Sequence, residues 1–333
     1  TNGQVLTTDG SGAVTFADAG GGAALELYAE NPSSPTAPSA TGTNAVAIGA
    51  SSSATGNDSA VVGNYASATA YAAAAFGVLA VAAGAYSVAL GKSRAGGSSS
   101  LAAAIDNNTA TYGATGANSV AIGYLAKASG TASIAFGEAS KGAGAYGISI
   151  GYQSNASGLG SIAIGNQYYL GATTASGGSS IAIGDDAEAT QKFSTALGAA
   201  SVSSIAGKYA YAGGRFSSSG DSQSGTFVLR SDTTDATPEA LTTDNTTAGT
   251  TNQVILPNNS AYSFSGTIIA RQQASAGSEY ASWEIKGALL RDANAASTVL
   301  GSGIKNKLYA SAGAAAWDVS LTADTTNGGL AIT

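Results

Sequence analysis

The chain of 333 residues contains no cysteine and no histidine. Without cysteine it has neither disulfides nor thiolate metal ligands, although this absence does not identify a cellular compartment. Without histidine it has no Ser-His-Asp triad, no imidazole metal ligand and no histidine proton shuttle. Many routes to catalysis are therefore excluded, and we assign to this chain no catalytic residue, no metal ligand and no cofactor.

Charged residues are also scarce. They make up only 10% of the chain, against about a quarter in ordinary soluble domains. The 13 Lys and Arg residues form no cluster and the net charge is -7, whereas nucleic acids and anionic membranes attract concentrated positive charge. No apolar run approaches the ~20 residues of a membrane span. We therefore expect neither nucleic-acid binding nor membrane insertion, and because Thr1 is not an initiator methionine we expect a fragment or processed product.

Glycine is abundant, with 46 residues, and alanine and serine fill much of the remaining chain. Such a composition offers few large side chains for a conventional globular core and few charges to keep neighbouring molecules apart. Repetition or oligomerisation is therefore the expected source of stability.

Short apolar words that end in glycine recur every fourteen residues, which is the signature of a repeat architecture. The words VAIG, IAFG, ISIG and IAIG end at four successive glycines, and the same spacing continues on both sides. The repeat-turn glycines are Gly49, Gly63, Gly77, Gly91, Gly123, Gly137, Gly151, Gly165, Gly184 and Gly198. The spacing breaks between 91 and 123, where LAAAIDNN is a degenerate copy, and between 165 and 184, where five extra residues predict a loop.

Each repeat reads as two short strands and two turns. A second glycine often follows seven residues after the first, as at Gly130 and Gly144, and we expect both glycines to supply the positive φ of tight turns. In the first strand bulky residues flank alanine, as in VAI at 120–122, and in the second strand small residues flank a variable, often polar one, as in AKA at 126–128.

These patterns predict a parallel β-coil of two sheets whose rungs stack at about 4.8 Å. The interior of one such coil is too small to bury both the bulky row and the alanine rows. We therefore predict that several chains pack side by side.

The flanks differ from the repeats. Residues 1–44 predict a β-hairpin at QVLTTDGSGAVTF and a linker rich in Pro, Ser and Thr, residues 45–216 hold the repeats, and residues 217–333 contain strands at short spacing. The strands TFVLRS, QVIL, AYSFSGTIIARQ, YASWEIKGALLRD, KLYAS and WDVSLTAD predict an antiparallel sandwich or jelly roll. Because GLAIT reads as a strand at the end of the chain, we expect this domain to be truncated at Thr333.

The words NSVAIG, SIAFG and SIAIG at this spacing resemble the head repeats of trimeric autotransporter adhesins, the YadA-like head, over about residues 44–216. The resemblance implies an all-β protein with a left-handed parallel β-roll in which three chains form one trimer, displayed on a surface for attachment. The flanks, including TNGQVLTTDGSGAVTF and LPNNSAYSFSGTIIARQ, resemble segments of phage and prophage tail fibres.

Several motifs have a functional and a structural interpretation. GAGAYG at 142–147 fits a dinucleotide-binding pattern and ALGKS approaches a phosphate loop, but both lie within strand repeats. Asp185, Asp186 and Glu188 have the oxygen ligands of a hard cation, or form a solvated turn. The possible glycosidase carboxylates are Glu279, Glu284, Asp292 and Asp318.

Aromatic side chains are the candidate receptor contacts, because an aromatic face is flat and apolar. Six candidates come from the C-terminal region, and alternation predicts that most of them are core residues: Tyr262, Phe264, Tyr280, Trp283, Tyr309 and Trp317. Tyr168 and Tyr169 lie in the inserted loop, where they are well placed for binding. We select Tyr168, Tyr169, Trp283 and Trp317 as candidate receptor contacts.

Together these features predict a non-enzymatic homotrimeric phage tail fibre, located on the virion, that attaches to a host cell-surface glycan or protein and contacts other tail or virion proteins. One alternative is the passenger head of a bacterial trimeric autotransporter adhesin on the cell surface. A second alternative is a capsule-degrading tail spike.

Overall fold

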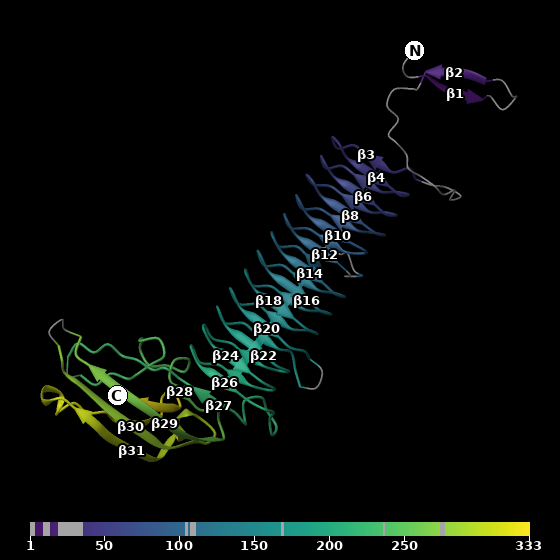
Figure 1. Ribbon diagram of the computed structural model, residues 1–333. Coiled ribbons are helices and arrows are strands. Elements are labelled where there is room, and N and C mark those ends of the chain that lie inside the picture. The colour runs from purple at the N-terminus through teal and green to yellow at the C-terminus, as the bar shows by residue number, and fades with distance from the viewer. Residues whose placement is uncertain are drawn as a thin grey trace. The chain divides into compact units, whose positions relative to one another are not determined.

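The computed structural model describes residues 4–8, 14–18, 36–103, 106, 111–167, 170–235, 237–273 and 277–333 (Figure 1). These residues form strands and two short 3-10 helices but no α-helix, which confirms the predicted all-β class. The chain divides into two compact units, Thr1–Leu125 and Ala126–Thr333. Both contain parts of a parallel β-solenoid that has about 12 turns, and the sequence-based domain boundaries after residues 44 and 216 stay predictions.

The first unit begins with two strands that pair antiparallel, β1 (Gln4–Thr8) and β2 (Val14–Asp18), as predicted. Of the predicted linker ENPSSPTAPSATG, residues 30–35 lie outside the described residues, and Ser39–Ala40 form a strand that pairs with the next rung. Solenoid rungs follow, each with one three-residue and one two-residue strand. The three-residue strands are β4 (Val46–Ile48), β6 (Ala60–Val62), β8 (Ala74–Phe76), β10 (Val88–Leu90), β12 (Leu101–Ala103) and β14 (Val120–Ile122). The two-residue strands are β3 (Ser39–Ala40), β5 (Ser53–Ala54), β7 (Ser67–Ala68), β9 (Val81–Ala82), β11 (Arg94–Ala95) and β13 (Gly113–Ala114).

The second unit continues with rungs of the same kind. Its three-residue strands are β16 (Ile134–Phe136), β18 (Ile148–Ile150), β20 (Ile162–Ile164), β22 (Ile181–Ile183), β24 (Thr195–Leu197) and β26 (Tyr209–Tyr211). Its two-residue strands are β15 (Lys127–Ala128), β17 (Lys141–Gly142), β19 (Asn155–Ala156), β21 (Thr174–Ala175), β23 (Glu188–Ala189) and β25 (Val202–Ser203). The parallel stack ends where β27 (Ser224–Thr226) pairs antiparallel with β26.

Parallel pairing joins equivalent positions of successive rungs. Ile134 pairs with Ile148 and Ile148 with Ile162, so the register advances by fourteen residues. At the insertion Ile162 pairs with Ile181, and the ladder therefore continues in register across the five extra residues. Strand β12, in the predicted degenerate copy, pairs with both β10 and β14.

Alanine and serine fill the narrow interior of the rungs. In the three-residue rung strands from β6 to β26 the central residue is buried, and Ala75, Ala121 and Ala135 are 0% exposed. Buried serine hydroxyls donate to the backbone of their own turn, as Ser133 Oγ does to the carbonyl of Gly130 at 2.7 Å. Most rungs thereby satisfy their own buried polar side chain, and Ser52 and Ser140 are exceptions whose hydroxyls have no partner among the described residues.

The two turns of a rung use glycine differently. Nine of the ten predicted repeat-turn glycines have positive φ, between 68° and 151°, and Gly165 is the exception. The expectation that the second glycine also supplies positive φ is wrong. There the left-handed residue lies two positions later, at Asp58 after Gly56 or Tyr146 after Gly144, with φ of 58° and 59°.

A different constraint explains the second set of glycines. A Cβ atom on Gly130 would lie 2.5 Å from the carbonyl carbon of Gly144 in the next rung. The second-turn glycines therefore permit close stacking of neighbouring rungs rather than an unusual φ.

The C-terminal region contains two antiparallel sheets of three strands, which confirms its predicted antiparallel β character. One sheet has the order β28 (Val254–Ile255), β33 (Gly329–Ile332) and β32 (Leu321–Asp324). The other has the order β29 (Ser260–Arg271), β30 (Tyr280–Arg291) and β31 (Val299–Ala310). The short helices η1 (Ala295–Ser297) and η2 (Ala312–Ala314) lie before and after β31.

One hydrophobic core joins the two sheets. Trp283 and Leu289 of β30 belong to the same buried cluster as Leu330 and Ile332 of β33. The eight strands of a jelly roll are not found within the described C-terminal residues, and of the predicted strand TFVLRS only Thr226 is in a strand. Phe227 and Leu229 instead line an open groove beside β29.

Candidate functional site

The outward side chains of the three-residue strands form two apolar rows, here called the apolar face. In the first unit Val62, Phe76 and Leu90 are 40–41% exposed, and in the second unit Phe136 is 52% exposed. Within each row the strands pair in register, so that isoleucines of successive rungs adjoin one another. An apolar surface of this extent on a single chain indicates an interaction surface.

The two-residue strands present a different surface. Their outward residues include Ser53, Arg94, Lys127, Asn155 and Glu188, all partly exposed. The predicted contrast between a strand with a bulky apolar row and a strand with a solvent-exposed polar side is therefore present. Alanine, rather than the bulky residues, fills the interior.

The predicted aromatic contacts lie in different surroundings. Tyr168 and Tyr169 lie outside the described residues. Trp283 is 1% exposed and belongs to the C-terminal core, while Trp317 is half-buried and packs against that core. The structure thus places Trp283 where alternation along β30 places a core residue, and the selection of these aromatic residues as receptor contacts stays a prediction.

Two other aromatic residues of the C-terminal region are exposed. Tyr280 is 41% exposed and Tyr309 is 49% exposed, whereas Tyr262 and Phe264 are half-buried against the core. The rings of Tyr280 and Tyr309 are stacked, with centroids 4.8 Å apart and planes inclined by 25°. A hydrogen bond with Tyr280 is the main cause that raises the pKa of the Tyr309 hydroxyl.

The sequence assigned no special role to this pair, because Tyr280 and Tyr309 are 29 residues apart. The two tyrosines come together because β30 and β31 pair, which their spacing in the sequence does not reveal.

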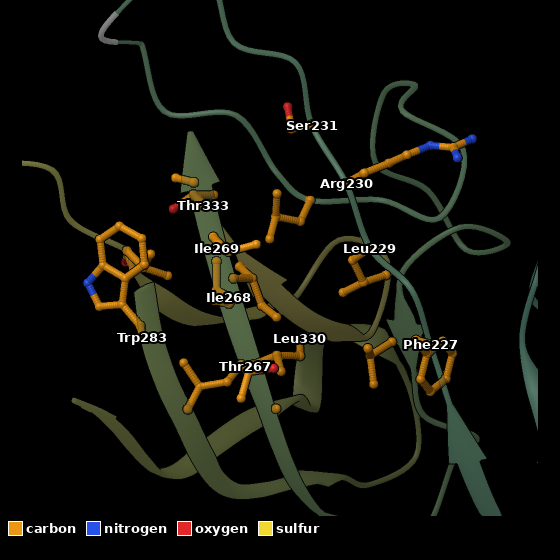
Figure 2. A pocket seen from close by; sticks show the side chains of 18 of the residues that line it. Phe227, Leu229, Arg230, Ser231, Thr267, Ile268, Ile269, Trp283, Leu330 and Thr333 are labelled. Atoms are coloured by element: carbon orange, nitrogen blue, oxygen red, sulfur yellow. The ribbon is translucent and has the colours of Figure 1, made fainter. Parts of the chain in front are cut away.

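The groove between the segment 227–241 and β29 has a volume of about 1850 Å³. Figure 2 shows Phe227 and Leu229 across from β29, which carries Ile268 and Ile269. Ile269 is 75% exposed, and β29 lies at the edge of its sheet. The groove is therefore an open, partly apolar surface next to an unpaired sheet edge.

In the acidic cluster DDAE, Asp186 is bound by side chains of the same chain. Asp186 is 7% exposed, and its Oδ2 accepts a hydrogen bond from Arg215 Nη1 at 3.1 Å and another from Ser219 Oγ. Burial, followed by the negative charge of Asp186, raises the pKa of Glu188. Among the described residues, no three or more Asp, Glu, His or Cys side chains lie close enough together to hold a metal ion. The partner Arg215 lies 29 residues from Asp186, so sequence spacing does not predict this contact.

Two of the four C-terminal carboxylates take part in structural hydrogen bonds. Glu279 Oε2 accepts from Ser311 Oγ and from the Gly313 amide at 2.8 Å. Asp318 Oδ2 is bound by Lys305 Nζ at 2.5 Å, and this bond lowers the pKa of Asp318. Glu284 is half-buried on β30, and Asp292 is exposed beyond its end. The prediction that the chain is not an enzyme stays a prediction.

Comparison with known families identifies the repeats. Residues 40–66, 68–93, 114–138, 143–167 and 175–201 match the YadA head domain repeat (2 copies). A comparison with curated proteins finds no match to this chain. Within the described residues, no helix has both the length and the apolar character needed to cross a membrane.

The chain thus carries YadA head domain repeats, which indicate an adhesin-like fibre. YadA-like heads are generally homotrimeric adhesins that bind host surface molecules, and they are extracellular or surface-exposed.

Proposed function

We propose that the chain is part of a homotrimeric phage tail fibre that attaches the virion to a cell-surface receptor of its host. The solenoid forms a stiff shaft, and the C-terminal sheets meet the receptor. Three equivalent weak sites on one assembly raise the effective concentration of each site and thus provide avidity.

The apolar face is the observation that carries this proposal. Fully burying one large apolar side chain contributes about 1.5–3 kcal/mol, so covering a half-exposed one contributes about 1 kcal/mol. The apolar face repeats such side chains on successive rungs of both units, including Phe76, Leu90, Phe136 and Ile150. The sum over many rungs exceeds the ~4–15 kcal/mol that association costs.

The resemblance of the flanking segments to tail fibres favours a virion over a bacterial surface. The passenger head of a bacterial autotransporter adhesin is the second candidate, and the matched repeats support it equally. A membrane anchor and coiled-coil stalk encoded in the same gene would identify the bacterial adhesin. A capsule-degrading spike would release reducing ends from host polysaccharide, and we expect none.

Sedimentation of the purified chain tests the assembly. We expect a trimer for the native chain, and a monomer for a double variant with Ile134→Lys and Phe136→Lys, because both side chains belong to the apolar face. The matched control Asn155→Lys adds a charge to the polar strand β19 and should remain trimeric. A folded native monomer, or a double variant that stays trimeric, would contradict the proposal.

Attachment is tested separately with fluorescently labelled chain on a panel of bacterial strains. Flow cytometry should show saturable binding to a subset of strains. Failure to bind any strain would remove the proposed role in host attachment.

A further inference from the structure

A second surface feature lies in the C-terminal region, at the end of the β29–β30–β31 sheet where β30 begins. It consists of the stacked rings of Tyr280 and Tyr309 together with Glu279 and Ser311, and we call it the tyrosine platform. Ala281, the neighbour of Tyr280 on β30, is fully buried. Because successive side chains of a strand point to opposite faces, Tyr280 points away from the core.

Backbone hydrogen bonds hold the platform in place. The amide of Tyr280 donates to Ser311 Oγ at 3.0 Å, and the amide of Ser311 donates to the Tyr280 carbonyl at 3.0 Å. Since the rings also stack on each other, little side-chain freedom remains to be lost when a ligand binds.

A carboxylate and a guanidinium group flank the rings. Glu279 Oε2 is held by Ser311 and by the Gly313 amide, and the described part of the chain shows no hydrogen bond to Glu279 Oε1. The carboxylate is near enough to Tyr309 to contribute to its raised pKa. Arg271 pairs with Tyr280 in the sheet register and is exposed, so one positive and one negative group flank the rings.

We propose that the tyrosine platform is a carbohydrate-binding site that takes one pyranose ring of the receptor glycan. The apolar C–H face of a pyranose fits a flat exposed aromatic surface, and its hydroxyls donate to the free carboxylate oxygen. A neutral, hydroxyl-rich ring suits this site better than a strongly charged ligand, because Glu279 and Arg271 balance in charge. This inference rests on the proposed function and names the receptor class.

A printed array of hexopyranose oligosaccharides, including fragments of bacterial surface polysaccharides, tests the site with the full chain as probe. We expect the native chain to bind at least one oligosaccharide class. Tyr280→Ala and Tyr309→Ala should each weaken that binding about tenfold, because one change removes the ring that meets the sugar and the other removes the ring stacked behind it. Tyr309→Phe keeps the ring and should stay within about threefold of the native chain.

Two controls separate loss of binding from loss of structure. Tyr65→Ala removes an exposed tyrosine of the solenoid, 60% exposed, and should leave array binding unchanged. Glu279→Gln keeps the shape of the side chain but weakens its acceptor strength, and it should lower binding even if an alanine variant folds poorly. Each variant should also have the melting temperature of the native chain, which shows that it is folded.

The outcomes distinguish this inference from the proposed function. If the trimer forms and binds cells, but the native chain binds no oligosaccharide or the alanine variants bind as well as the native chain, the platform is not the glycan site. Binding to cells stripped of surface polysaccharide would point to a protein receptor and would also overturn it. A monomer, or a chain that binds no cells, would instead refute the proposed fibre.

Discussion

Replacing Gly137 by alanine should break the solenoid locally between two rungs. Gly137 has φ of +121°, a conformation that residues with a Cβ rarely adopt. A Cβ built at this position lies 2.7 Å from the carbonyl oxygen of Gly151 in the next rung, which is closer than real Cβ contacts. The substitution therefore combines backbone strain with a collision against a neighbouring backbone.

The expected loss of stability follows from these two contributions. Holding a non-glycine residue in a sparsely populated region costs about 1–3 kcal/mol, and overpacking a tight contact costs about 1–3 kcal/mol. We expect Gly137→Ala to lower the free energy of unfolding by about 2–6 kcal/mol per chain. Urea denaturation should show the lower midpoint, and hydrogen exchange should show lost protection in residues 134–136 and 148–150, which pair across this step.

Ala139→Gly is the matched control, two residues away in the same turn. Ala139 already has φ of +53°, so glycine there relieves the left-handed conformation of alanine while adding freedom to the unfolded chain. These effects nearly cancel, and we expect a change within about 1 kcal/mol. A Gly137→Ala variant as stable as Ala139→Gly would refute the assignment of Gly137 as a residue that requires the absence of a Cβ.

Lys208 is 5% exposed and burial lowers its pKa to about 8, so Lys208→Met should stabilise the chain at pH 7 by up to about 3 kcal/mol. Below pH 8 the lysine is charged in both the folded and the unfolded chain, so the full cost of burying the charge lowers the stability of the native protein. As pH rises from 8 to 10.5 the lysine loses its proton in the folded chain first, and the urea midpoints of the native protein and the variant should converge. A constant gap between the two midpoints would contradict the burial of a charged lysine. Ala135→Leu should destabilise by about 1–3 kcal/mol in thermal denaturation, because a fully buried alanine has no room for a larger side chain; an unchanged midpoint would mean that the interior is looser than described. Asp221→Ala should make the loop after Phe216 more sensitive to limited proteolysis, because the carboxylate accepts from the amides of Phe216, Ser217 and Ser218. These bonds lower the pKa of Asp221 to about 2, so their stabilising effect should persist at neutral pH and be lost as pH falls from 3.8 through 2, while equal cleavage rates of the two chains at neutral pH would contradict it.

The solenoid was predictable because its repeat is local. A fourteen-residue spacing of glycines and a two-residue alternation of large and small side chains predict the strands and the turns, as in VAI at 120–122. Which row points inward, the alanines, is seen only in the structure. The role of the second-turn glycines was not predictable, because their constraint comes from the next rung. A residue such as Gly130 encounters Gly144 only after the rungs have stacked.

The C-terminal region was predictable as antiparallel sheets but not as a site. Alternation in YASWEI indicates which residues share a face, and Trp283 is buried as that pattern favours. Sequence spacing gives no information about which strands become neighbours. The stack of Tyr280 on Tyr309 and the pairing of Asp186 with Arg215 both join residues that are 29 positions apart.

The five-residue insertion leaves the pairing of Ile162 with Ile181 in register. A rung corner can therefore acquire or lose peptide segments while the hydrogen-bonded ladder stays the same. Two kinds of sequence change are therefore independent in such a molecule. Gain or loss of whole rungs changes the length of the solenoid, and insertion or deletion at a corner changes the peptide segment exposed there. The same separation makes the corner after Gly165 a natural place to graft foreign epitopes.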